Sequence, residues 1–174
     1  MPAFTPEAIV WSNPDVRATL RQQGLLTVLE SAEDELRGRL HEKNYVIEEI
    51  DFEKPFVEVR QQIGALFRWE EQFGYRYEDS EGNLDALQDG FCLPAELGGR
   101  TALLLRNVDG ANLRDGWVEG FLSIASEHSQ YQLALGARFF TVLVVGEKSG
   151  IVGRSIRDVT VPHVQGRLFE HRPR

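Results

Sequence analysis

The sequence of 174 residues contains a single cysteine, Cys92, and no long apolar run. One cysteine excludes a disulfide within the chain and any zinc site built from several cysteines. It agrees with a reducing compartment, so we expect a cytoplasmic protein. No apolar run approaches the roughly 20 residues of a membrane span. Residues 1–11 contain Glu7 and no basic residue, so we expect no secretory signal peptide.

Motifs for catalysis and for metal binding are also scarce. Residues 145–150 contain Lys148-Ser149 but lack the upstream glycine of a phosphate-binding loop. Ser126, Glu127 and His128 are consecutive, and consecutive positions on a helix do not face one another. The four histidines lack metal-ligand spacing; they are His41, His128, His163 and His171. We therefore expect no cofactor, no resident metal and no enzymatic activity. An enzyme using Asp85, Asp89 or Cys92 is the least favoured alternative.

Basic residues are outnumbered, with 19 Lys and Arg against 27 Asp and Glu, which gives a formal net charge of −8. Binding to phosphate groups needs a basic surface, so nucleic acid is disfavoured as a direct ligand. A basic protein partner is favoured instead. The length and the apolar content of 42% suit one domain with a sizeable core, with or without an extension.

Apolar runs alternate with helical patterns along the chain and predict an α/β fold. Strands are expected at residues 25–29, 45–50, 101–105 and 139–145. Helices are expected at 15–23, 31–43, from 55 onward, 83–92 and 115–128, with 130–135 extending or following the last. This order predicts a small, mostly parallel four-stranded sheet packed with helices. Residues 1–24 form an extension, and residues 147–174 form a basic tail that packs on the domain or is partly mobile, with an edge strand at 159–161.

The segment between Glu70 and Asp89 is the most acidic part of the chain. Its only basic residue is Arg76. The acids are Glu70, Glu71, Glu78, Asp79, Glu81, Asp85 and Asp89. A solvated loop is one interpretation of such a run, and a binding surface is the other.

Residues 83–92 are organised by helical spacing. Leu84, Leu87 and Phe91 share an apolar stripe, and Asn83 suits the N-cap. The neighbouring stripe consists of Asp85, Gln88, Asp89 and Cys92. Like charges one turn apart cost a helix a few tenths of a kcal/mol, which a cationic ligand would offset.

The pair Asp85 and Asp89 has several interpretations. A general acid–base pair would need a cleft and a partner group, and neither is evident. A metal site would need further ligands, which Asp79 and Glu81 could supply. As anion mimics, two carboxylates with Cβ atoms about 5–6 Å apart could replace successive phosphates and bind paired arginines. An exposed helix face with incidental acids is the remaining alternative.

Two motifs resemble the barstar family of intracellular ribonuclease inhibitors. They are Asn83-Leu84-Asp85-Ala86-Leu87-Gln88-Asp89 and the preceding aromatic–glycine pair, Phe73-Gly74. The resemblance covers residues 45–146, and residues 25–43 resemble the extra strand–helix unit of longer members. It implies a barstar-like α/β domain over residues 25–146. The implied partner is a basic ribonuclease of the extracellular type, whose active site is blocked by acids that mimic phosphates.

The resemblance also implies roles for individual residues. Asp89 would be the central acid in the nuclease active site, with Asp85 beside it and Glu127 as a further acid. Gln88 stands where the original inhibitor has tryptophan, and residues 75–82 are inserted before Asn83. This insertion departs from the family: either Tyr75 or Tyr77 lays an aromatic ring on the enzyme, or the insertion belongs to another partner. We also expect Asp79 and Glu81 to be partner-binding residues. The alternative is a barstar-fold interaction or regulatory module without a nuclease target.

Overall fold

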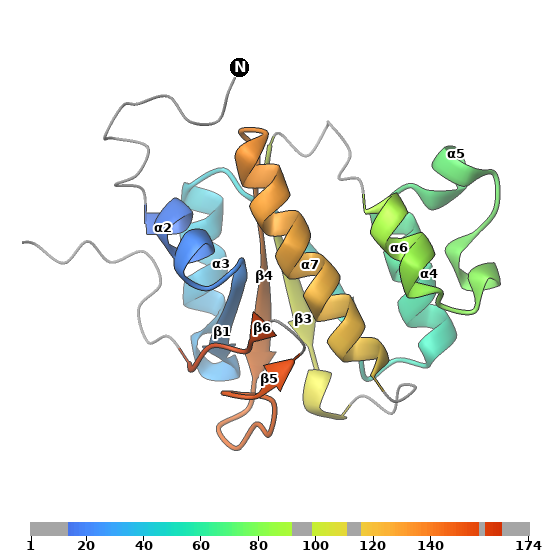
Figure 1. The fold of residues 1–174 in the computed structure, drawn as a ribbon. Helices are drawn as coiled ribbons and strands as arrows, with labels where there is room; N and C mark the ends of the chain where they lie inside the picture. The colour runs from blue at the N-terminus through green and yellow to red at the C-terminus, as the bar shows by residue number, and fades with distance from the viewer. Residues whose placement is uncertain (1–13, 92–98, 111–115, 157–158, 165–174) are drawn as a thin grey trace, which may run out of the picture.

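The computed structural model describes residues 14–91, 99–110, 116–156 and 159–164 (Figure 1). Its main sheet has four strands in the order β1-β4-β3-β2, and every pair is parallel. The strands are β1 (Leu25–Leu29), β2 (Val46–Asp51), β3 (Arg100–Arg106) and β4 (Arg138–Val145). The predicted α/β class and the four-stranded sheet are confirmed.

The helices largely follow the predicted segments. They are α2 (Pro14–Arg21), α3 (Glu33–Glu42), α4 (Phe56–Leu66), α5 (Trp69–Phe73), α6 (Leu84–Gly90) and α7 (Trp117–Ala134). Short 3-10 turns occupy Glu30–Ala32, Tyr77–Ser80 and Val108–Gly110. Residues 130–134 continue α7 without a break. The acidic segment after Trp69 is not simply a loop, because α5, one 3-10 turn and α6 lie within it.

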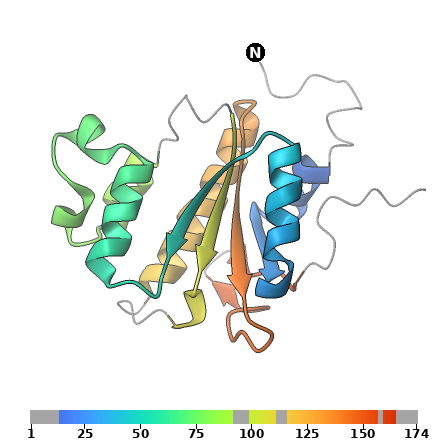
Figure 2. The same ribbon diagram turned by 180° about the vertical axis from the view of Figure 1, so that it is seen from behind.

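The two faces of the sheet are covered by different helices. Alternate strand side chains point to opposite faces, so Leu25 and Leu26 belong to separate apolar clusters. On one face, α3 covers the sheet, as Figure 2 shows, and its Leu36 and Leu40 belong to the apolar cluster on that face. On the other face, α7 lies along the sheet, and the unit formed by α4, α5 and α6 stands beside it (Figure 1).

The strands β1 and β2 lie at opposite edges of the sheet, although only the 3-10 turn at Glu30–Ala32 and α3 separate them in the chain. The crossover therefore spans the whole sheet before the chain returns through β3 to β4. Strand β4 fills the place beside β1, from Leu25 paired with Thr141 to Leu29 paired with Val145. Because α7 directly precedes β4, which lies inside the sheet beside β1, α7 lies over the middle of the sheet.

The described part of the C-terminal tail packs on the domain. Its buried apolar residues join the core cluster on the α7 side; they are Ile151, Ile156, Val159 and Val161. The strands β5 (Ser155–Ile156) and β6 (Val159–Thr160) pair antiparallel with each other. The predicted edge strand at 159–161 therefore pairs outside the main sheet. Arg154 lies 3.4 Å from Glu119 of α7, which ties the tail to that helix.

A network of charged residues joins α3 to the sheet. The Glu33 residue is only 4% exposed. Its carboxylate accepts hydrogen bonds from Arg37, at 2.7 Å, and from Arg106. Burial by itself raises the pKa of Glu33, but the hydrogen bonds and charges of Arg106 and Arg37 outweigh burial and hold this pKa below its ordinary value. The carboxylate therefore stabilises the fold in its ionised form.

We expect Glu33→Gln to lower the free energy of unfolding by about 2 kcal/mol at pH 7, because the amide carries no charge and turns an N–H2 donor, in place of one acceptor oxygen, toward one of the two arginines. The folded-state pKa of Glu33 is lowered, so this stabilisation is present above the unfolded-state pKa and is lost as pH falls through the folded-state pKa. The difference between the variant and the wild type should therefore shrink below about pH 4. Urea unfolding at pH 7 and pH 3 measures both values.

The matched control is Glu42→Gln, because Glu42 is exposed at the end of the same helix. We expect that change to stay within about 0.5 kcal/mol. Equal unfolding free energies for the Glu33 variant and the wild type at pH 7 would contradict the assigned role.

Candidate functional site

Helix α6 begins as its sequence predicts. The Asn83 side chain accepts hydrogen bonds from the backbone N–H groups of Asp85, at 2.9 Å, and Ala86, at 3.3 Å. This N-cap satisfies two donors that the first turn otherwise leaves free. Leu87 and Phe91 are buried in the core, so the rotation of the helix about its axis is set. The opposite side of α6 must consequently face outward.

The polar side of α6 faces solvent, as the spacing indicates. Asp85, Gln88 and Asp89 are all exposed. Within the described part of the chain, neither Asp85 nor Asp89 forms an ion pair or accepts a side-chain hydrogen bond. Both carboxylates are therefore available to an external cation.

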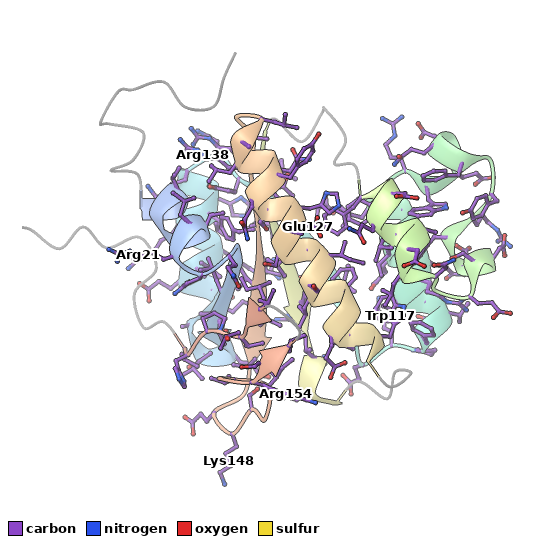
Figure 3. The ribbon with its side chains drawn as sticks, viewed as in Figure 1. Arg21, Trp117, Glu127, Arg138, Lys148 and Arg154 are labelled. Atoms are coloured by element: carbon purple, nitrogen blue, oxygen red, sulfur yellow. The ribbon has the colours of Figure 1, made fainter. Side chains whose placement is uncertain are left out.

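Helix α7 lies beside α6 and extends this surface. The Gln88 side-chain amide donates to the Glu127 carboxylate at 3.3 Å, although the two residues are 39 positions apart. Glu127 is exposed and belongs to the middle of α7 (Figure 3). The structure therefore assembles what we call the acidic α6–α7 face, which consists of Asp85, Gln88, Asp89 and Glu127.

The two candidate tyrosines occupy different environments. The Tyr75 residue is 40% exposed, and its ring lies edge-on to Trp69 with centroids 6.2 Å apart. The Tyr77 residue is 0% exposed, with its ring 4.6 Å from that of Trp69 and its hydroxyl donating to the Asn83 carbonyl. Burial accordingly raises the pKa of Tyr77. The prediction that Tyr77 lies at a binding surface is wrong, because its ring fills the core beneath α5, and Tyr75 alone remains at the surface.

The two acids of the insertion differ from Asp85 and Asp89. Asp79 is paired with Arg76 at 3.2 Å, which already offsets its charge. Glu81 is exposed in a left-handed turn with φ of 56°. Among the residues that the structure describes, no group of three or more histidine, cysteine, aspartate or glutamate side chains could hold a metal ion. The metal-site interpretation therefore gains no support from the structure.

The aromatic–glycine pair has a structural explanation. Phe73 packs on Trp69 with ring centroids 4.6 Å apart, and Gly74 ends α5 with φ of 74°, where a side chain would be strained. Both rings press against Gly90 of α6, where an added Cβ would lie 2.3 Å from Trp69 and 2.7 Å from Phe73. The absence of a side chain at Gly90 thus allows α5 to pack closely against α6. The sequence signal for it was an isolated glycine within a helical pattern.

Two hollows among the described residues lie away from the paired aspartates. One, of about 920 Å³, is lined by residues that follow the carboxyl ends of the strands, among them Lys54, Asp109 and Lys148. Another, of about 440 Å³, lies beside α5 and is lined by Arg68, Trp69 and others. Neither is lined by Asp85 or Asp89, so the interpretation of these residues as an acid–base pair gains no support.

Comparison with protein-family models, curated proteins and solved structures gave no match for this chain. Within the described ranges, none of the helices is long and apolar enough to cross a membrane. Cys92, the last residue of the predicted polar stripe, lies outside the described residues.

Proposed function

We propose that this protein is a barstar-like inhibitor that binds a basic ribonuclease and blocks its active site. One observation carries the proposal: Asp85 and Asp89 are exposed on a capped helix and have no cationic partner within the described chain. A helix face with two uncompensated carboxylates suits a surface with cations at matching spacing. The resemblance of residues 83–89 and of Phe73-Gly74 to barstar supports the same partner.

The inhibitor would act by placing its carboxylates in the active site of the nuclease, and it would catalyse no reaction itself. Arginine or lysine groups that normally bind RNA phosphates would instead form charge-assisted hydrogen bonds with Asp89 and Asp85. The Asn83 cap and the buried Leu87 hold the helix in place before binding, which lowers the entropic cost of association. Glu127 would add a third carboxylate at the edge of the contact. RNA is then excluded by occupancy of the same cleft.

We expect the association rate constant with the ribonuclease to fall at least tenfold between low salt and about 0.5 M salt, because the net charge of −8 steers a basic partner. The dissociation rate constant should change much less. Surface plasmon resonance of the purified protein against a nuclease captured from host culture supernatant measures both constants. The same sample should lose its RNA-hydrolysing activity at a one-to-one ratio. Failure to inhibit any captured ribonuclease, or salt-independent association, would contradict the proposal.

The alternative is an interaction or regulatory module without a nuclease target. The observation that favours it is Gln88, whose amide is engaged with Glu127 of the same chain. A neighbouring open reading frame for a small basic secreted nuclease would favour inhibition. Specific capture from lysate of a protein that lacks ribonuclease activity would favour the alternative.

A further inference from the structure

We infer that His128 of α7 is a positioning residue for the acidic α6–α7 face: its ring holds the last turn of α6 and thereby Asp89. The part of this inference that concerns partner binding rests on the proposed function. The seating of α6 on α7 does not, and can be measured without any partner.

The contacts of His128 lie on both sides of Asp89 in the chain. Its Nε2 is 3.2 Å from the carbonyl oxygen of Gln88. Its ring stacks on Phe91, with centroids 4.5 Å apart and planes 21° apart. Its Nδ1 is buried and has no hydrogen-bond partner among the described residues. The tautomer that satisfies this geometry carries its proton on Nε2 and donates to the Gln88 carbonyl.

Helix α6 needs this contact because it is short. It has seven residues, and helices of that length owe their stability to tertiary packing rather than to their own hydrogen bonds. The Gln88 carbonyl belongs to the last turn, where carbonyls have no partner within the helix. His128 supplies the missing donor, so the backbone that carries Asp89 is held by a hydrogen bond on one side and by ring stacking on the other.

The charges around His128 define how the contact should respond to pH. Glu127, its neighbour in α7, attracts the protonated ring, and Asp85 and Asp89 lie on the outward side of α6. Tyr131 of α7 meets the ring edge-on at 6.3 Å. From the strands, the residue behind Phe91 is Phe139 of β4, which carries no charge.

Burial lowers the pKa of His128 and outweighs both the Gln88 hydrogen bond and Glu127, which raise it. A ring released from α6 would recover an ordinary pKa near 6.5. Because the pKa of the packed ring is lowered, the packing of His128 against α6 is most stable above the ordinary pKa. This packing weakens as pH falls through the pKa of the packed ring. We therefore expect α6 to loosen in mildly acidic solution.

The test uses the full chain and His128→Phe, which keeps a ring against Phe91 and removes the hydrogen bond. Hydrogen exchange of residues 84–91 at pH 7 should quicken about tenfold in the variant. The control is His41→Phe, an identical change at an exposed histidine of α3, which should leave that segment unchanged. His128→Gln retains a donor and should restore part of the protection. The ratio between variant and wild type should also shrink between pH 7 and pH 5.

Unchanged exchange of residues 84–91 in His128→Phe would overturn the inference, as would an equal acceleration across every segment. Binding to the captured ribonuclease should weaken about tenfold in the same variant. If the wild type inhibits no ribonuclease while the variant still accelerates exchange of α6 selectively, the proposed function fails and the positioning role stands. If the wild type inhibits and exchange is unchanged, the positioning role fails and the proposed function stands.

Discussion

Asp89→Ala is expected to weaken capture of the ribonuclease at least about 100-fold, the largest effect that we expect from a change on this surface. Asp89 is exposed, lacks an internal ion pair among the described residues, and is adjacent to Gln88, which links α6 to α7. At the centre of an interface, removing one member of a buried charge pair costs about 2–5 kcal/mol, because the partner's cation is left without its acceptor. Most of the loss should appear in the dissociation rate constant.

Two further variants distinguish the specific contribution of Asp89 from the effect of the overall net charge of the protein. Asp89→Asn keeps the shape and removes the charge, so it should lose most of the same affinity. Glu147→Ala removes one negative charge from an exposed position after β4, and it should change affinity less than about threefold. Equal weakening by the Asp89 and Glu147 variants would indicate general electrostatic attraction and would contradict a central role for Asp89.

Gly90→Ala is expected to lower the melting temperature by about 6 °C. The new Cβ would lie 2.3 Å from Cζ3 of Trp69, which is 1% exposed and held between other rings. Overpacking of this kind costs about 1–3 kcal/mol, and each kcal/mol shifts the melting temperature of a chain this size by about 2–4 °C. Differential scanning calorimetry measures the shift. The same change should also displace α5 and quench or shift the emission of Trp69.

The chain offers a matched control in Gly38→Ala. Gly38 is exposed within α3, and an added Cβ there meets nothing within 4 Å. We expect that variant to be more stable by about 0.5–1 kcal/mol, because alanine is the better helix former. A Gly90 variant as stable as the wild type would contradict the close packing of α5 on α6.

The sequence by itself determined the features that depend on neighbouring residues. The apolar run at 25–29 is strand β1, and the apolar run at 139–145 is likewise part of strand β4. Asn83 caps α6, and the three-and-four spacing of Leu84, Leu87 and Phe91 sets which side of that helix is exposed. These features were predictable because capping and periodicity act within one or two turns of the chain.

Tertiary structure decided what depends on distant parts of the chain. Tyr75 and Tyr77 are the same residue type two positions apart, and only the packing of Trp69 assigns one to the surface and the other to the core. The contacts of Gln88 with Glu127 and His128 join residues about 40 positions apart. The burial of Ile151, Ile156, Val159 and Val161 likewise depends on distant residues, since these four join the core cluster that contains residues of α7. Such contacts follow from how whole elements pack, which no local pattern of residues encodes.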